Sequence, residues 1–387
     1  MNTLRLLLLL LLASWSTAAS VTLRDLTYST KAHERHKLDL YLPEKTDRPA
    51  PLIIWIHGGG WQNGSKENCL PLRQGWLERG YAIASINYRL SGHAIFPAQI
   101  EDCKAAIRWL RANATTYQID PARFGVWGSS AGGHLAALVG TSGDVKAFDV
   151  GDHLDQSSRV QAVCDYFGPT DFKAFVTHPG YENHSSATSP ESLLLGGTVK
   201  EKPDQATAAN PLTYVSTDDP PFLIVHGDKD PVVPIQQSEL LFTSLKTANR
   251  SVHFHTIHGA AHGQGFTGPE ILPMVQAFFD LQLKGEMKTT TPTALATNSK
   301  ADSAVARPDA GNRQLPTFAQ ILTRHDSNRD GKIARDEFHG PRVLFDRLDA
   351  NKDAFVTSEE HQKFASAENK RPTSPPSTTG SKNTKSP

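Results

Sequence analysis

Cysteine is scarce in this chain of 387 residues, which contains only Cys69, Cys103 and Cys164. Three thiols allow at most one disulfide, so the fold does not rest on a disulfide framework and must bury a hydrophobic core. Cys103 lies at helical spacing from Ile100 and Ile107, which favours a small core residue over a reactive thiol.

An excess of charge of either sign is also absent. The chain has 40 Lys and Arg residues against 40 Asp and Glu residues, so its formal net charge is zero with neutral histidines. Nucleic acid attracts a basic surface, and this balance therefore predicts no nucleic-acid partner. Beyond the N-terminus, no apolar run approaches the roughly 20 residues that a membrane-spanning helix needs.

Residues 1–19 have the pattern of a secretory signal peptide. Arg5 precedes a run of leucines, and small residues follow at Ala18 and Ala19. The run is short for a membrane-spanning helix, which favours a cleaved signal over an anchor. We therefore expect a secreted or periplasmic protein without a membrane span.

Residues 20–285 alternate short apolar runs with helical patterns. This alternation predicts an α/β fold, in which a mostly parallel sheet is covered by helices on both faces. The continuous apolar run at 51–56 is typical of a strand that is buried on both sides. Further strands are expected at 81–88, 123–128, 160–168, 221–227 and 251–257, and helices at 97–112, 132–140 and 236–248.

The composition changes after residue 285. Residues 286–314 are rich in Thr, Ala, Ser and Pro and have no periodic apolar face, which predicts a flexible linker. A small module is expected at 315–367. The polar residues 368–387 are expected to be a disordered tail.

Gly128-Ser129-Ser130-Ala131-Gly132 matches the pattern Gly-x-Ser-x-Gly, between a predicted strand and a predicted helix. The pattern needs glycines because the serine of such a turn has strained backbone angles and larger neighbouring side chains would collide. The turn presents the hydroxyl at a helix N-terminus, where developing negative charge is stabilised. Ser130 is therefore the candidate nucleophile, and a simple helix-capping turn is the alternative.

The stretch HGGGW at 57–61 also follows a predicted strand. Acyl transfer places negative charge on a carbonyl oxygen, which backbone N–H groups must be positioned to receive. Gly58 and Gly59 can supply such donors, together with the amide of Ala131. His57 is expected to position this loop rather than to act as a base, and a plain glycine turn is the alternative.

Two later loops offer the partners that a serine nucleophile needs, namely a base that takes its proton and an acid that orients the base. HGDKDPVVP at 226–234 contains Asp228 and Asp230, and HGAAHGQGF at 258–266 contains His258 and His262. The order serine, acid, histidine occurs in serine hydrolases. Each of these four residues has the alternative of a solvated loop position.

In this order, the four motifs resemble those of the α/β-hydrolase superfamily. The stretch NYRLS…FPAQIEDCKAAIRWL…YQIDPARFGVWGSSAGGHLAAL is similar to the bifunctional acetyl-xylan/feruloyl esterases and related carboxylesterases and lipases, and the resemblance extends over residues 23–283. It implies an α/β-hydrolase fold for the domain at 20–285. The site residues it implies are the nucleophile Ser130, the acid Asp230, the base His262 and an oxyanion hole of Gly58, Gly59 and Ala131.

The resemblance implies a serine esterase that needs no cofactor for catalysis and acts on a small ester or an acylated polysaccharide. Acetyl or feruloyl groups on plant polysaccharide are the first expectation, and a general short-chain carboxylesterase or lipase is the alternative. A prolyl-oligopeptidase-like peptidase shares the HGxxD motif, but such enzymes usually carry a large propeller. A non-catalytic binding module is disfavoured because all three triad residues are present.

The C-terminal module contains two twelve-residue stretches in which oxygen-bearing side chains have calcium-loop spacing. The first, at 326–337, has Gly331 at the sharp turn and offers Asp326, Asn328, Asp330, the carbonyl of Lys332, and Glu337. The second, at 349–360, offers Asp349, Asn351, Asp353, Phe355, Thr357 and Glu360. Ala354 replaces the turn glycine there, which costs about 1 kcal/mol and predicts a weaker site.

The two loops resemble an EF-hand pair, a small all-α module. Ile333 and Val356 occupy equivalent loop positions at which the loops can pair. The connection between the loops is shorter than usual, and the spacing also resembles dockerin modules, which would imply a scaffold or surface partner. We expect Ca²⁺ to be structural here, with an effect on stability and none on turnover.

Overall fold

The computed structural model describes residues 20–44, 48–285, 318, 322, 330–335, 338, 345 and 347–368. The chain divides into two units, residues 1–292 and 293–387. The predicted signal peptide (1–19), the linker (286–314) and residues 369–387 of the predicted tail lie outside the described residues. Their structural assignments therefore stay predictions.

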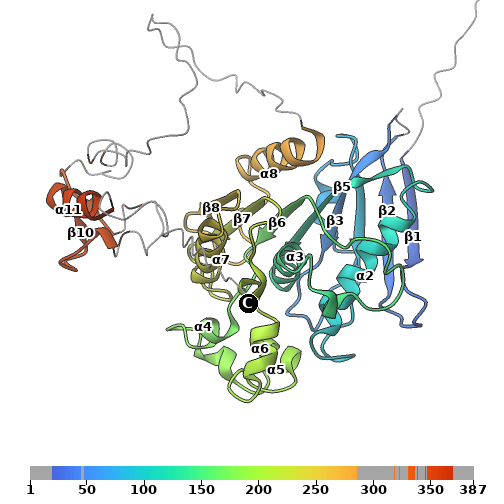
Figure 1. Cartoon of the computed structure of the whole chain (residues 1–387), viewed down its shortest axis with the longest axis horizontal. Helices are drawn as coiled ribbons and strands as arrows, with labels where there is room; N and C mark the ends of the chain where they lie inside the picture. Colours follow the sequence, from blue (N-terminus) through green and yellow to red (C-terminus); the bar gives the residue numbers. More distant parts are fainter. Residues whose placement is uncertain are drawn as a thin grey trace, which may run out of the picture. The chain divides into compact units, whose positions relative to one another are not determined.

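The first unit is built around an eight-stranded sheet with the strand order β1-β2-β4-β3-β5-β6-β7-β8 (Figure 1). β2 runs antiparallel to its two neighbours, and the other neighbouring pairs are parallel. The strands are β1 (Val21–Thr27), β2 (Lys37–Leu42), β3 (Ala50–Ile56), β4 (Ala82–Ile86), β5 (Ile119–Ser129), β6 (Ala162–Tyr166), β7 (Phe222–Gly227) and β8 (Val252–Ile257).

Helices cover both faces of this sheet. α2 and α3 lie on one face and α8 lies on the other, as Figure 1 shows. The expected mostly parallel sheet with helices on both faces is therefore confirmed. In the described part of the first unit, the helices outside the segment between β6 and β7 are α1 (Leu70–Arg73), α2 (Ala98–Ala112), α3 (Ala131–Thr141), η1 (Lys146–Phe148), α7 (Gln236–Thr247), α8 (Ile271–Phe279) and η4 (Asp280–Lys284).

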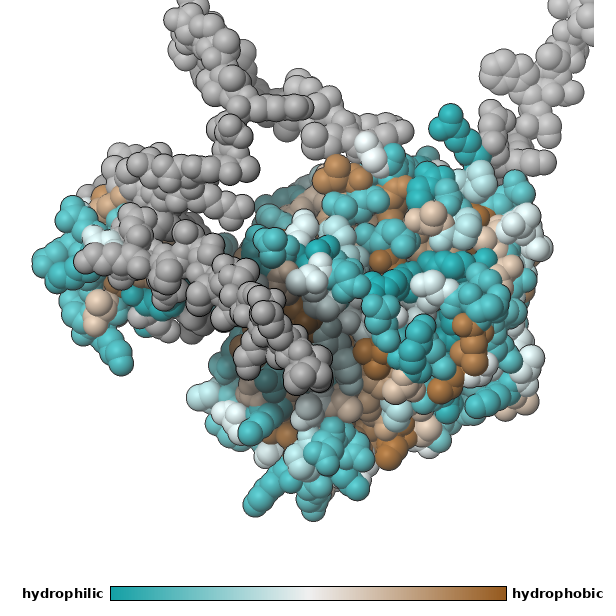
Figure 2. Space-filling model, viewed as in Figure 1, coloured by the Kyte–Doolittle hydropathy of each residue, from teal (hydrophilic) through white to brown (hydrophobic). Residues whose placement is uncertain are grey.

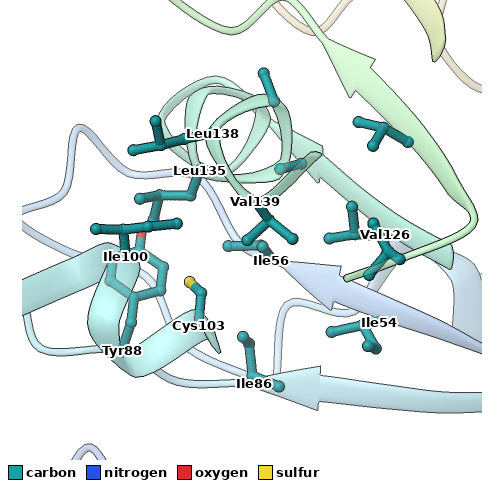
Figure 3. Packing of buried hydrophobic residues seen from close by; sticks show 14 of the residues in the cluster. Ile54, Ile56, Ile86, Tyr88, Ile100, Cys103, Val126, Leu135, Leu138 and Val139 are labelled. Atoms are coloured by element: carbon teal, nitrogen blue, oxygen red, sulfur yellow. The ribbon is translucent and has the colours of Figure 1, made fainter. Parts of the chain in front are cut away.

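β3 illustrates why both faces must be covered. Ile54 and Ile56 belong to the core cluster beneath α2 and α3, whereas Ile53 and Trp55 belong to the cluster beneath α8. Successive side chains of a strand point to opposite faces, so all four are buried only where helices lie on both sides. Figure 3 shows the first cluster, where the sheet meets Ile100, Cys103, Leu135, Leu138 and Val139.

The predicted strands at 51–56, 81–88, 221–227 and 251–257 correspond to β3, β4, β7 and β8, and the helices at 97–112 and 236–248 correspond to α2 and α7. Cys103 is fully buried, which confirms it as a core residue. β5 begins at Ile119, earlier than its apolar pattern predicts, and β1 and β2 have no counterpart among the predicted strands. These segments carry more polar side chains, which weakens an apolar pattern.

Between β6 and β7 the chain forms a helical insert, residues 172–214. It contains α4 (Phe172–Val176), η2 (Glu182–Ser185), α5 (Pro190–Leu195), α6 (Pro203–Ala208) and η3 (Pro211–Tyr214). α4, α5 and α6 lie together beside the sheet (Figure 1). α5 is capped at both ends, since the Ser189 hydroxyl accepts the N–H of Ser192 and Gly196 ends the helix with a φ of 76°.

The surface of the first unit has no broad apolar area on the face that Figure 2 shows, where hydrophobic residues are interspersed with hydrophilic ones. Large exposed hydrophobic side chains among the described residues are Val21, Ile95, Leu154, Leu193, Val232, Leu281 and Phe355. In the described ranges, no helix combines the length and the apolar character that a bilayer crossing requires.

The described part of the second unit contains a two-stranded sheet and a small core. β9 (Ile333–Ala334) pairs antiparallel with β10 (Phe355–Val356), and Val356 lies opposite Ile333. The prediction that these two residues pair the loops is therefore confirmed. Ile333, Phe345, Leu348 and Val356 form the core, and α11 (Ser358–Glu368) follows the second loop.

Candidate active site

Ser130 occupies the turn between β5 and α3. Its φ of 55° and ψ of −124° are unusual for a residue with a side chain, and such angles cost about 1–3 kcal/mol. Two hydrogen bonds hold the turn, because the Ser130 N–H donates to the Tyr166 carbonyl at 2.8 Å and the His134 N–H donates to the Ser130 carbonyl at 3.0 Å. The fold thus stabilises a strained backbone at this serine.

The glycines on either side of Ser130 are required by close backbone contacts. A Cβ atom at Gly128 would lie 2.1 Å from the carbonyl oxygen of Gly132, and one at Gly132 would lie 2.1 Å from the carbonyl oxygen of Ile56. Both distances are far shorter than a van der Waals contact. The predicted steric need for glycine at these positions is confirmed.

The structure brings together the three residues that the motifs single out. The Nε2 atom of His262 lies 3.1 Å from the Ser130 Oγ, and its Nδ1 atom lies 2.7 Å from the Oδ2 atom of Asp230. Ser130 follows β5, Asp230 follows β7 and His262 follows β8, so three parallel strands of one sheet, with β6 between the first two, supply the three side chains. The Nδ1–H of His262 donates to the carboxylate, which leaves Nε2 as the acceptor for the Ser130 hydroxyl.

Asp230 is buried and held in its ionised form. Burial raises the free energy of the charged carboxylate, but hydrogen bonds from His226, from His262 and from the Val233 N–H outweigh it and hold the pKa of Asp230 below its usual value. The Val232 N–H also donates to its Oδ1 atom at 2.8 Å. An ionised partner fixes the orientation of the His262 ring and stabilises its protonated form.

The other acid and the other histidine of the same motifs pair with each other. The Nδ1 atom of His258 lies 3.1 Å from the Oδ2 atom of Asp228, and the His258 side chain is 64% exposed. Asp228 also accepts the N–H of Gly259 at 2.7 Å. This geometry leaves Asp230 and His262 as the residues in contact with Ser130.

The predicted oxyanion residues Gly58, Gly59 and Ala131 all line the pocket that contains Ser130. Ala131 is the first residue of α3, so its N–H is not used within the helix. A Cβ atom at Gly58 would lie 2.8 Å from the Ser129 carbonyl oxygen, and Gly59 has a φ of 111°. The glycine loop therefore packs closely against the Ser130 turn, and backbone N–H groups in such a place suit the binding of a developing oxyanion.

His57 anchors this glycine loop as a neutral ring. Arg35 can only donate, so its contact of 3.1 Å with Nε2 makes that atom an acceptor, and Nδ1–H donates to the Gly58 carbonyl at 2.7 Å. Burial lowers the pKa of His57 to about 4, and the Arg35 guanidinium acts in the same direction. The ring stacks on Tyr88 and does not contact Ser130, which agrees with a positioning role.

The pocket around Ser130 has a volume of about 550 Å³. Trp61 belongs to its wall but is only 1% exposed, and its Nε1–H donates to the Nδ1 atom of His134 at 3.2 Å. Phe167 contacts the His262 ring edge-on, with 4.5 Å between the ring centroids. The other lining residues are Gly60, Gln62, Asn63, Gly64, Asn68, Ser129, Pro169, His184, Pro190, Glu191, Val232 and Val233.

Sequence reasoning assigned no role in the site to several residues that the structure places there. His226 lies at the start of HGDKD and is fully buried, and its Nε2 atom is 3.4 Å from the Oδ2 atom of Asp230. Tyr181 of the helical insert donates its hydroxyl proton to the Asp230 carbonyl oxygen. His184 and Glu191 reach the pocket from the same insert. Only the fold brings this insert to the triad.

The predicted calcium ligands are partly outside the described residues. Asp326, Asn328 and Glu337 of the first loop lie outside the described residues, whereas Asp330 and Lys332 of the same loop are described. In the second loop, Glu360 accepts the N–H groups of Asn351 and Thr357, and Asp349 accepts those of Asp353 and Ala354. No group of three or more His, Cys, Asp or Glu side chains among the described residues is arranged to hold a metal ion.

Comparisons with known proteins place the chain in a family. The BD-FAE family model matches residues 38–245, which is more than half of the chain. Esterase LipQ of Mycobacterium tuberculosis (strain ATCC 25618 / H37Rv) is 35% identical over 219 residues, which cover 56% of this chain and 50% of LipQ. The chain thus spans about half the length of the curated relatives it matches.

Two solved structures are similar to the first unit. A truncated form of a carbohydrate esterase from gut microbiota is 35% identical with a TM-score of 0.63, and the match covers 70% of this chain and 98% of that one. An acetyl ester-xyloside bifunctional hydrolase from Caldicellulosiruptor lactoaceticus is 27% identical with a TM-score of 0.52, covering 64% and 87%. The chain belongs to the BD-FAE family.

Proposed function

We propose that this chain is a serine esterase that hydrolyses carboxylic esters through an acyl-enzyme. The observation that carries the proposal is the continuous line of hydrogen bonds from Asp230 through His262 to the Ser130 hydroxyl, in a pocket that Ser130 and His262 line. The Ser130 Oγ attacks the ester carbonyl carbon while its proton moves to the Nε2 atom of His262. The negative charge of Asp230 stabilises the imidazolium that forms.

The same groups complete the reaction, with His262 passing on the proton that it took from Ser130. The tetrahedral oxyanion is bound by N–H groups of Gly58, Gly59 and Ala131, and His262 gives its proton to the leaving alcohol. Water then attacks the acyl-enzyme, His262 takes a proton from it, and the acid leaves as Ser130 regains its hydrogen. No cofactor takes part in these steps.

For the natural substrate we propose acetyl or feruloyl groups on plant polysaccharide. The support comes from two similar solved structures, those of a carbohydrate esterase and of an acetyl ester-xyloside bifunctional hydrolase. A general short-chain carboxylesterase is the second candidate, favoured by the 35% identity with Esterase LipQ. The signal-peptide pattern of residues 1–19 supports export of the protein to the place where such polymers occur.

A substrate panel tests this proposal. Wild type and the Ser130→Ala variant are incubated with p-nitrophenyl esters of increasing chain length, methyl ferulate, acetylated xylan and a prolyl peptide. Release of acetate or ferulate by the wild type alone supports the polysaccharide-esterase proposal. Preference for short p-nitrophenyl esters without release from xylan supports a general carboxylesterase. Long-chain preference indicates a lipase, and cleavage of the peptide alone contradicts the proposal.

For the C-terminal module we propose an EF-hand-like pair that binds Ca²⁺ for stability, with a scaffold or surface partner as the second hypothesis. The spacing of the second loop supports calcium, as does the φ of 69° at Ala354, the position where such a loop turns sharply. The oxygens of the second site would come from Asp349, Asn351, Asp353, Phe355, Thr357 and Glu360. Those of the first site would come from Asp326, Asn328, Asp330, Lys332 and Glu337.

A further inference from the structure

A second histidine–carboxylate pair lies in the wall of the Ser130 pocket. The Nδ1 atom of His184 is 3.0 Å from the Oε2 atom of Glu191, and the two side chains are 9% and 3% exposed. Both residues belong to the helical insert, and both line the pocket together with Ser130 and His262. Among the described lining residues, Glu191 is the only one with a carboxylate.

The pair is held rigidly. The His184 ring packs on Phe175 with 4.4 Å between the centroids, and the His184 N–H donates to the Tyr181 carbonyl at 3.0 Å. Tyr181 in turn donates its hydroxyl proton to the carbonyl oxygen of Asp230. Glu191 lies in the capped first turn of α5. The insert therefore places the pair at a defined position relative to the triad.

Stabilisation of the fold gives a poor explanation for this pair. A buried carboxylate loses its hydration, and a hydrogen bond from one histidine seldom recovers that free energy unless further hydrogen bonds satisfy the remaining lone pairs. The Oε1 atom of Glu191 and the Nε2 atom of His184 have no hydrogen bond to another group in the described part of the chain. Both atoms are therefore available to a molecule that enters the pocket.

The chemistry of the two available atoms indicates what they bind. When the His184 ring is neutral and its Nδ1–H is donated to Glu191, the Nε2 atom is an acceptor, and the Oε1 atom of Glu191 is another. Two acceptors in one wall of the pocket match the hydroxyl groups of a polyol, each of which donates one hydrogen bond. An acetyl group offers no donor and a feruloyl group offers a single phenolic hydroxyl, so neither acyl group can donate to both acceptors.

We propose that His184 and Glu191 form a subsite for the hydroxyl groups of the alcohol half of the ester, in a sugar or a similar polyol. This inference rests on the proposed esterase function and assigns substrate specificity to the helical insert. The pair selects esters of polyols over esters of alcohols that lack hydroxyl groups, because only a polyol satisfies both acceptors.

The Glu191→Gln variant tests this subsite, because it keeps the size of the side chain and removes its charge. The kcat/KM of the wild type and the variant is measured on methyl 2-O-acetyl-β-xyloside and on p-nitrophenyl acetate. Loss of a hydrogen bond to a charged group should lower kcat/KM on the sugar ester by about 10-fold or more, with p-nitrophenyl acetate changed by less than about 2-fold. Glu182→Gln is the matched control, since Glu182 lies in the same insert and is exposed.

Equal losses on both substrates, or a loss on neither, would overturn the inference. A His184→Gln variant repeats the measurement if Glu191→Gln does not fold, as judged from its thermal melting curve. Binding of xylobiose, followed by NMR on the wild type and on the variant, separates this inference from the proposed function because it needs no turnover. Binding that Glu191→Gln weakens supports the subsite even if the wild type hydrolyses no sugar ester, and absence of binding to the wild type contradicts it.

Discussion

The Nε2 atom of His262 lies 3.1 Å from the hydroxyl oxygen of Ser130, although 132 positions separate the two residues in the chain. β5 ends at the serine, and the loop after β8 carries the histidine. Both lie at the carboxyl ends of parallel strands in one sheet, which is where such folds place their sites. The nucleophile and its base are therefore brought together by the backbone fold.

Replacement of Ser130 by Ala should abolish hydrolysis while the protein stays folded. The variant lacks the attacking oxygen, and the expected fall in kcat/KM on p-nitrophenyl acetate is about 10⁴-fold or more. Ser129→Ala is the matched control, because Ser129 is the neighbouring serine and its hydroxyl does not contact His262. We expect this control to stay within a few-fold of wild type. A large loss of activity in Ser129→Ala, with activity retained in Ser130→Ala, would show that Ser130 is not the nucleophile.

Gly58→Ala should lower kcat strongly while the protein stays folded. The added methyl group would lie 2.8 Å from the Ser129 carbonyl oxygen and 3.3 Å from the Ser130 Cβ, so the glycine loop has to move. Misplaced oxyanion donors cost about 10²–10³-fold in kcat. Thermal melting and kcat on p-nitrophenyl acetate are the measurements.

Gly80→Ala is the comparison for that variant. Gly80 has a φ of 78° and open space around the added methyl group, so the substitution carries only the backbone penalty. That penalty is about 1 kcal/mol, with no change in kcat. If Gly58→Ala kept full turnover, the oxyanion role of its loop would be wrong.

Asp165 should make the free energy of unfolding depend on pH. Its Oδ1 atom accepts the Gly168 N–H at 2.9 Å, and burial raises the pKa of Asp165 to about 7. The folded protein thus holds this proton more tightly than the unfolded chain, in which an aspartate titrates near pH 4. The resulting stability is complete below about pH 4 and is lost as the pH rises to about 7.

The Asp165→Asn variant isolates this effect because the amide keeps the acceptor for Gly168 and does not titrate. Between about pH 4 and pH 7.5, the unfolding free energy of the wild type should fall by roughly 2–4 kcal/mol relative to the variant. Chemical denaturation at a series of pH values measures the difference. A difference that stays constant with pH would show that Asp165 does not titrate in this range.

Calcium should bind the second loop through Glu360. Glu360→Gln removes one charge at the last loop position, and we expect the calcium affinity of the full chain to fall by about 10-fold or more. Glu359→Gln is the matched control, since that side chain is 79% exposed and pairs with Lys363. Isothermal titration calorimetry compares the two variants, and equal affinities would argue against the proposed site.

A chelator should lower the melting temperature of the C-terminal unit without changing the hydrolysis rate. The expected result is an unchanged rate on p-nitrophenyl acetate, because the predicted ligands belong to residues 326–360 and the triad belongs to the first unit. A rate that collapses while the first unit stays folded would show that calcium takes part in turnover.

Most strands of the central sheet can be predicted from local patterns of apolar residues. Runs such as 51–56 are apolar at every position, and the structure buries each of them, because the strands at the centre of the sheet are covered on both faces. β1 has mostly exposed or half-exposed side chains at the edge of the sheet, so its residues carry no comparable apolar signal. The helical insert consists of short helices whose ends depend on individual capping residues.

The candidate site likewise has one part that local motifs predict and another part that only the folded structure determines. Short motifs next to predicted strands single out Ser130 and include Asp230 and His262 among a few candidates, because the close packing of such a turn and the chemistry of each loop need particular residue types at fixed spacing. The motifs also contain Asp228 and His258, and the distinction rests on which side chains reach the serine. Motif spacing limits the candidate triad residues to a few, and the distances between side chains in the folded protein show which of them reach Ser130.

Residue type and order along the chain were enough to predict a parallel α/β sheet, a strained serine turn and the loops that carry its partners, because backbone preference and apolar burial act over a few neighbouring positions. Contacts between distant segments required the folded molecule. The contact of Tyr181 with Asp230, which is 49 positions away, and the placement of His184 and Glu191 in the pocket of Ser130 depend on how the insert and the loops pack. No local pattern encodes such contacts, since their partners come together only when the whole sheet has formed.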